Sequence, residues 1–143
     1  MANPGAATTI TVHPQVLSSN QAIRLIAYAT SVSINATGDA AITLPVINTT
    51  TYNVTNVVIT NANKDVSAGA LAIWTGAAGT GTEIVTNAAL TNNTSSAFVT
   101  KSTVVAATGT ANISAQTFYV KVGTAVSGGT VDIYVYGTDF TAF

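Results

Sequence analysis

The segment TFYVKVGTAVSGGTVDIYVYG, residues 117–137, carries the clearest pattern in the chain. Apolar and polar residues alternate on both sides of the pair Gly128 and Gly129, and this alternation is typical of strands that bury one face. A two-residue turn at the glycines predicts a β-hairpin that pairs Ser127 with Thr130. The predicted hairpin places one apolar stripe on the core side, formed by Val120, Val122, Val126, Val131, Ile133 and Val135.

The opposite face of this predicted hairpin carries side chains that suit contact with another molecule. In the predicted register Lys121 lies across from Tyr136, so that a cation and several rings share one patch. Tyrosine offers a large contact area at low entropic cost and is enriched at protein interfaces. Coverage of this face within the monomer, and stacking on a carbohydrate, are the alternatives. We predict four interface residues here: Tyr119, Lys121, Tyr134 and Tyr136.

The rest of the chain repeats the alternation in about eight to ten short segments, at the spacing of a sandwich or barrel. Val, Ile and Thr together supply 54 of the 143 residues, and β-branched side chains suit a pleated surface. The sequence therefore predicts an all-β chain, a single antiparallel β-sandwich or jelly-roll-like domain over residues 9–143. Residues 1–8 are expected to form a flexible, extended N-terminal arm, and a short helix is conceivable only around Asn87 to Leu90.

The first of these segments illustrates the predicted faces. Over residues 21–30 one face is expected to carry Ile23, Leu25, Ala27 and Ala29, with Arg24, Ile26 and Tyr28 on the opposite face. A second segment runs through Tyr52, Val54 and Val57 to Thr60, and a third covers residues 70–75.

Composition excludes several classes of function. Only 6% of residues are charged, against about 25% in an average soluble domain, and the net charge is −1. Such a chain lacks the basic surface that binds nucleic acid or anionic lipid. No apolar run reaches the length of a membrane span, and Met1 to Gly5 lack the pattern of a signal peptide. The absence of cysteine excludes disulfides and thiolate metal sites.

Residues that could carry catalysis are scarce and scattered. His13 is the one histidine, and no acidic residue lies within 20 positions of it to orient it as a base. The five acids are Asp39, Asp65, Glu83, Asp132 and Asp139, and their spacing does not demand a general acid/base pair. We therefore predict no catalytic residue, no cofactor and no enzymatic activity.

Residues 61–65, NANKD, place oxygen-bearing side chains at alternate positions, which superficially suits a calcium ion. The segment lacks the glycine and the distal glutamate of an EF-hand loop. An ordinary turn is therefore favoured, and no metal site is predicted.

The chain as a whole resembles the head decoration, or cement, proteins of tailed phages. The likeness lies in a Thr-, Asn-, Ala- and Val-rich β-chain with a small-residue N-terminus and no cysteine. The strands at 117–122 and 131–137 are similar in style to those of small virion-exterior proteins. The resemblance implies a protein made in the host cytoplasm that binds the major capsid protein on the outer capsid surface. It also implies a homotrimer that stabilises the shell by bridging capsomers. An N-terminal segment commonly contacts the capsid in that family, which would make Ala2, Asn3 and Pro4 interface residues.

Low charge is compatible with this interpretation, because a chain without strong colloidal repulsion is safest when copies of itself or a larger assembly cover its strand edges. Neither nucleic acid nor a membrane is an expected partner.

Two alternatives remain open. One is a carbohydrate-binding or host-attachment module that uses Trp74 together with Tyr119, Tyr134 and Tyr136; the other is a different virion component, such as a tail, neck or fibre protein.

Overall fold

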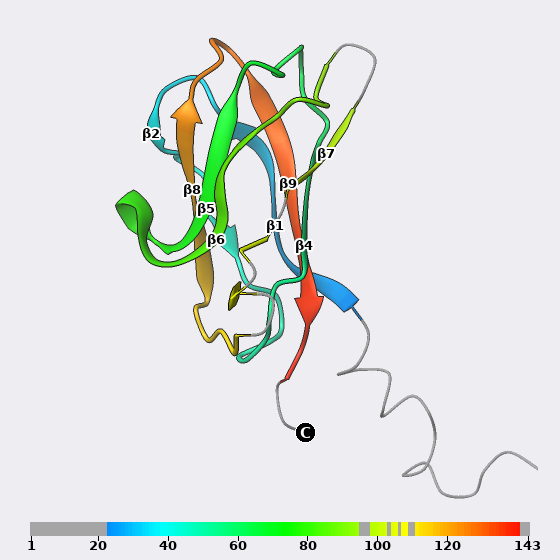
Figure 1. Cartoon of the computed structure of the whole chain (residues 1–143), viewed down its shortest axis with the longest axis vertical. Helices are drawn as coiled ribbons and strands as arrows, with labels where there is room; N and C mark the ends of the chain where they lie inside the picture. The colour runs from blue at the N-terminus through cyan, green and yellow to red at the C-terminus, as the bar shows by residue number, and fades with distance from the viewer. Residues whose placement is uncertain (1–22, 95–97, 103, 106, 109–110, 141–143) are drawn as a thin grey trace, which may run out of the picture.

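Two antiparallel sheets pack face to face in the computed structural model, which describes residues 23–94, 98–102, 104–105, 107–108 and 111–140 (Figure 1). The first sheet has the strand order β1 (Ile23–Ser33), β9 (Thr130–Thr138), β4 (Asn56–Thr60) and β7 (Val99–Ser102). The second has the order β2 (Gly38–Asp39), β8 (Thr117–Thr124), β5 (Ala70–Gly76) and β6 (Thr80–Ala89), and β3 (Leu44–Pro45) also pairs with β8. The 3-10 turn η2 (Ala77–Gly79) joins β5 to β6.

This arrangement confirms the predicted all-β sandwich. No helix within the described ranges is long and apolar enough to cross a membrane. The predicted arm, His13 and the candidate interface residues Ala2, Asn3 and Pro4 lie outside the described residues.

The predicted hairpin over residues 117–137 is wrong, because β8 and β9 belong to different sheets. β8 pairs with β5, β2 and β3, whereas β9 pairs with β1 and β4. The connection between them crosses from one sheet to the other at the top of Figure 1. Ser127 and Thr130 are therefore not partners in a ladder.

The turn itself explains why the two strands separate. It spans residues 126–129, and the Gly129 N–H donates to the Val126 carbonyl at 2.9 Å. Both ends of the turn bond to Ile34, which accepts from the Val126 N–H at 2.9 Å and donates to the Gly129 carbonyl at 3.0 Å. Gly128 adopts a left-handed conformation with φ of 66°, which favours glycine. Ile34, which follows β1, thus takes the hydrogen bonds of Val126 and Gly129 at the two ends of the turn. β8 and β9 therefore cannot pair with each other there.

The predicted apolar stripe is nevertheless the core. Five of its six members are almost completely buried, and Val126 is half-buried: the buried residues are Val120, Val122, Val131, Ile133 and Val135. They face one another from opposite sheets instead of lying side by side in one sheet. Tyr52, Val54 and Val57, from the second alternating segment, join this core and are fully buried.

β1 departs from the predicted alternation at two β-bulges. The register against β9 shifts between Leu25 and Ala27, so Ile26 and Ala27 are both buried, and their expected placement on opposite faces is wrong. Ile23, expected on the same face as Ala27, is 64% exposed at the start of the strand. The helix considered around residues 87–90 is also wrong, because β6 continues as a strand to Ala89.

Tyr52 supplies a pH-dependent part of the stability. Its ring packs edge-on against Phe118 with centroids 5.8 Å apart, and its hydroxyl donates to the Ala115 carbonyl. Burial raises the pKa of Tyr52 well above its usual range, since the phenolate would lose its hydration.

We therefore expect Tyr52 to make the fold sensitive to alkali. The unfolded chain ionises this phenol near about pH 10, while the folded chain keeps it neutral to a much higher pH. Its contribution is complete below that pH and is lost as the pH rises further, at up to about 1.4 kcal/mol per pH unit. Urea unfolding of the wild type and Tyr52→Phe across this pH range measures the effect. The stability difference between them should shrink as the pH rises; a constant difference would contradict the assignment.

Candidate functional site

The four predicted interface side chains do not form one patch. Tyr119 and Lys121 lie on the outer side of the β8 sheet, whereas Tyr134 and Tyr136 lie on the outer side of the β9 sheet. Because the two sheets pack core to core, these outer sides are opposite faces of the sandwich. The predicted contact of Lys121 with Tyr136 is therefore wrong, since it rested on the hairpin register.

The outer side of the four-stranded sheet is aromatic. Tyr28 on β1 stacks on Tyr134 of β9 with centroids 6.2 Å apart and an interplanar angle of 9°. The register continues this row from Tyr134 to Val58 on β4, and Tyr136 lies two residues further along β9. We call Tyr28, Tyr134, Tyr136 and Val58 the tyrosine face. Tyr28 is 44% exposed, so the stack is available to a partner.

The outer side of the five-stranded sheet contains a hollow of about 310 Å³. Trp74 on β5 lies across from Tyr119 on β8 and from Glu83 on β6. A register shift in β6 between the partners of Leu71 and Ile73 adds one residue to β6, so that Thr86 and Asn87 both lie across from Ala72. The lining residues, here called the tryptophan hollow, are Ala72, Trp74, Glu83, Thr86, Asn87, Lys121 and Gly123.

The tryptophan hollow carries one negative and one positive side chain. The Lys121 ammonium lies 3.5 Å from the Ala78 carbonyl, at the limit of a hydrogen bond. The neighbouring Asp39 carboxylate accepts the Ala78 N–H at 2.6 Å, which holds the η2 turn against β2. Among the described residues no side chain or carbonyl bonds to the Trp74 Nε1, although that atom is buried.

The oxygen-bearing side chains of residues 61–65 have separate partners. Asn61 donates to Asp132 at 2.8 Å, and Asn63 donates to the Gly128 carbonyl at 2.9 Å. Asp65 accepts from the hydroxyl of Ser67 and from its N–H, and these hydrogen bonds lower the pKa of Asp65. Residues 61–65 thus form a turn that is held by hydrogen bonds to the start of β9. Within the described ranges, no three His, Asp or Glu side chains gather where they could hold a metal ion.

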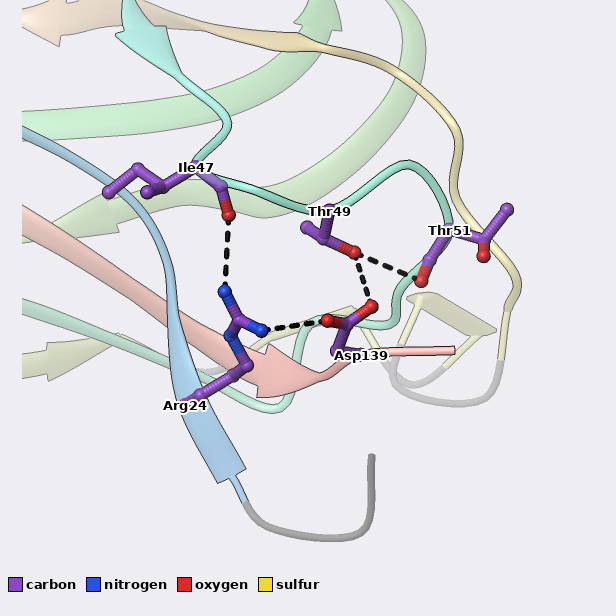
Figure 2. Close-up of polar contacts among 5 residues, drawn as sticks. All are labelled: Arg24, Ile47, Thr49, Thr51 and Asp139. Carbon is purple, nitrogen blue, oxygen red and sulfur yellow. Dashed lines mark hydrogen bonds and ion pairs between the residues drawn. The ribbon is translucent and has the colours of Figure 1, made fainter. Parts of the chain in front are cut away.

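One further polar cluster fastens an end of the sandwich (Figure 2). Asp139, just after β9, accepts from Arg24 of β1 at 2.8 Å and from the Thr49 hydroxyl at 2.5 Å. The Arg24 guanidinium also donates to the Ile47 carbonyl at 3.4 Å. Each of these polar groups forms a hydrogen bond with another group of the chain, so the cluster has a structural role: it fastens the end of β9 to β1 and to the segment of Thr49.

Glu83, Asn87 and Gly123 were not predicted as neighbours of Trp74. Gly123 lies on β8, which is distant from β5 in the sequence, and the bulge that brings Asn87 to the outer side of β6 is not visible in the alternation. The stack of Tyr28 on Tyr134 was not predicted either. The one available signal was that Tyr28, like Trp74, is a large aromatic residue in an alternating segment.

Comparisons of this chain with protein-family models, with curated proteins and with solved structures found no match.

Proposed function

We propose that this protein is a structural component of a phage virion that binds the major capsid protein on the outer surface of the shell. As a homotrimer it would bridge capsomers and so stabilise the assembled shell. The observation that carries the proposal is the tyrosine face: a stacked aromatic pair fixed on the paired strands β1 and β9, in a chain with very few charges.

The tyrosine face has the properties of a docking surface. The nearby Asp132 carboxylate already accepts from the Ser31 N–H and from Asn61, each at 2.8 Å, so a partner need not desolvate a free acid. The β7 edge adds the exposed residues Phe98 and Val99, at 63% and 42%. Rigid aromatic side chains beside apolar groups are the usual anchors of protein interfaces.

Many weak copies of such a contact suffice for the proposed role. Anything that binds the assembled state alone stabilises that state, and symmetric trimers multiply each contact. Lys101 on β7 lies across from Val58 at the edge of the tyrosine face, and the face is otherwise aromatic and apolar. Contacts with so few charges are little affected by ionic strength, which suits a particle that meets varied salt.

Sedimentation with capsid shells tests this function. The shells are DNA-free and assembled from the major capsid protein of the phage whose genome encodes this chain. We expect the wild type to pellet with the shells in a saturable manner, and Tyr134→Lys to bind about 30-fold more weakly, the effect of losing an interface anchor. Light scattering over a dilution series should give a dilution-stable trimer.

Tyr119→Lys is the matched control, because it adds the same charge on the opposite outer face. It should pellet like the wild type. A wild type that stays in the supernatant contradicts the proposal, and equal weakening by both lysine variants contradicts the assignment of the tyrosine face. A monomer at every concentration removes the trimer from the proposal.

A further inference from the structure

The geometry of the tryptophan hollow points to a second activity, the binding of a neutral sugar ring. The hollow lies on the opposite side of the sandwich from the tyrosine face, so the inference does not depend on shell binding.

The hollow exists because two of its residues have almost no side chain. Ala72 and Gly123 lie on neighbouring strands and line the hollow, and no large side chain extends into it from either position. A Cβ at position 123 would lie 2.1 Å from the Asn87 side-chain oxygen. The Asn87 amide thus reaches over Gly123. A volume of about 310 Å³ is at the lower end of the range for ligand pockets, which fits one ring better than a long ligand.

Trp74 offers the hollow a surface for stacking. Its Nε1 is buried without a partner among the described residues, so the indole N–H is not available to a ligand. Trp74 as a whole is half-buried, and it lines the hollow. The apolar C–H face of a pyranose packs well on such a ring. Tyr119, its cross-strand neighbour, extends the aromatic surface along β8.

Polar groups around the indole match the hydroxyls of a sugar. The structure gives the Glu83 carboxylate and the Asn87 amide no hydrogen-bond partner within the described ranges, and the one contact of the Lys121 ammonium is long, at 3.5 Å. Glu83 can accept from hydroxyls, Lys121 can donate to them, and Asn87 can do both. A polyol satisfies all three groups because each hydroxyl both donates and accepts.

Charge decides between a neutral and an ionic ligand. Glu83 and Lys121 carry opposite charges on either side of Trp74, so a ligand with one net charge is attracted by one group and repelled by the other. A neutral ring meets no such conflict. We therefore expect neutral sugars to bind in preference to amino sugars or uronic acids.

Intrinsic fluorescence provides the first test, because Trp74 is the one tryptophan of the chain. The probes are the methyl glycosides of glucose, galactose, mannose and N-acetylglucosamine, with glucosamine and glucuronic acid as charged comparisons. We expect a saturable change with at least one neutral glycoside in the millimolar range, and at least tenfold weaker binding of both charged sugars. No saturable change with any neutral probe overturns the inference, and so does tighter binding of a charged one.

Two substitutions locate the site. Gly123→Val fills the hollow and keeps Trp74 as reporter, and Glu83→Gln removes the carboxylate with little change of shape. Each should weaken binding at least tenfold, while a far-UV spectrum and the urea midpoint confirm that it is folded. Should Gly123→Val fail to fold, Glu83→Gln decides. Tyr134→Lys, which tests the tyrosine face, should bind sugar like the wild type. Undiminished sugar binding by the two hollow variants overturns the site, whatever the result with shells.

Discussion

Replacing Gly137 with alanine is expected to lower the free energy of unfolding by about 3 kcal/mol, near the upper end of what overpacking usually costs. Gly137 is buried in β9, and the backbone of Asn53 crosses directly over it. A Cβ at this position would lie 1.8 Å from the Asn53 carbonyl oxygen and 2.8 Å from its carbonyl carbon. No rotation of a side chain relieves this contact, because both atoms belong to the main chain.

The crossing segment is also tied to β9 by hydrogen bonds. The Asn53 N–H donates to the Thr138 carbonyl at 3.0 Å, and the Thr55 N–H donates to the Tyr136 carbonyl at 2.9 Å. Moving the segment away from a new methyl group therefore stretches the bonds on both sides of Gly137. A loss of this size is a large part of the total free energy of unfolding of an ordinary domain, which is roughly 5–15 kcal/mol.

Gly123→Ala is the matched control for Gly137→Ala. It also adds a methyl group to a strand glycine, but the new Cβ meets only the side chain of Asn87, which can rotate away on the surface. We expect its free energy of unfolding to stay within about 0.5 kcal/mol of the wild type. Urea unfolding with the slope fitted for each variant compares the two. If both alanine variants were equally stable, the close approach of Asn53 to β9 would be wrong.

The connection between β8 and β9 illustrates how far the sequence alone could go. The alternation in this stretch correctly predicts which residues are buried, because a side chain that faces the core does so in either arrangement. It cannot tell a hairpin from a crossing between sheets, since both bury the same valines. The choice depends on Ile34, which bonds to both ends of the turn from more than 90 positions away in the sequence.

The candidate sites were less accessible to sequence reasoning than the core. Tyr119, Lys121, Tyr134 and Tyr136 are on the outer side of their strands, as predicted, but the error in pairing placed them together. The tryptophan hollow is lined by residues from three strands, and its shape depends on a bulge in β6. Bulges shift a strand by one residue without an obvious mark in the composition, as the two in β1 also do.

The fastening around Asp139 leads to the second large effect (Figure 2). Its side chain is only 10% exposed, and it holds Arg24 at 2.8 Å in the one ion pair among the described residues. Asp139→Ala leaves the Arg24 guanidinium without its carboxylate and the Thr49 hydroxyl without its main acceptor. The pair is only partly buried, because the Arg24 side chain remains 34% exposed and water can solvate much of the charge that is left. We expect a loss of about 2 kcal/mol in the free energy of unfolding, mainly from the hydrogen bonds that Asp139 accepts.

Two further variants separate charge from shape at this position. Asp139→Asn keeps an oxygen that can accept from Thr49 but loses the ion pair with Arg24, so its loss should be about half as large. Asp65→Asn removes a carboxylate from an exposed turn whose two hydrogen bonds are local, and should leave the urea midpoint close to that of the wild type. The double variant Arg24→Ala with Asp139→Ala should lose clearly less than the sum of its single variants, since each single change already breaks the same pair. Additive losses would mean that Arg24 and Asp139 stabilise the sandwich independently, and that the end of β9 is fastened to β1 by packing alone.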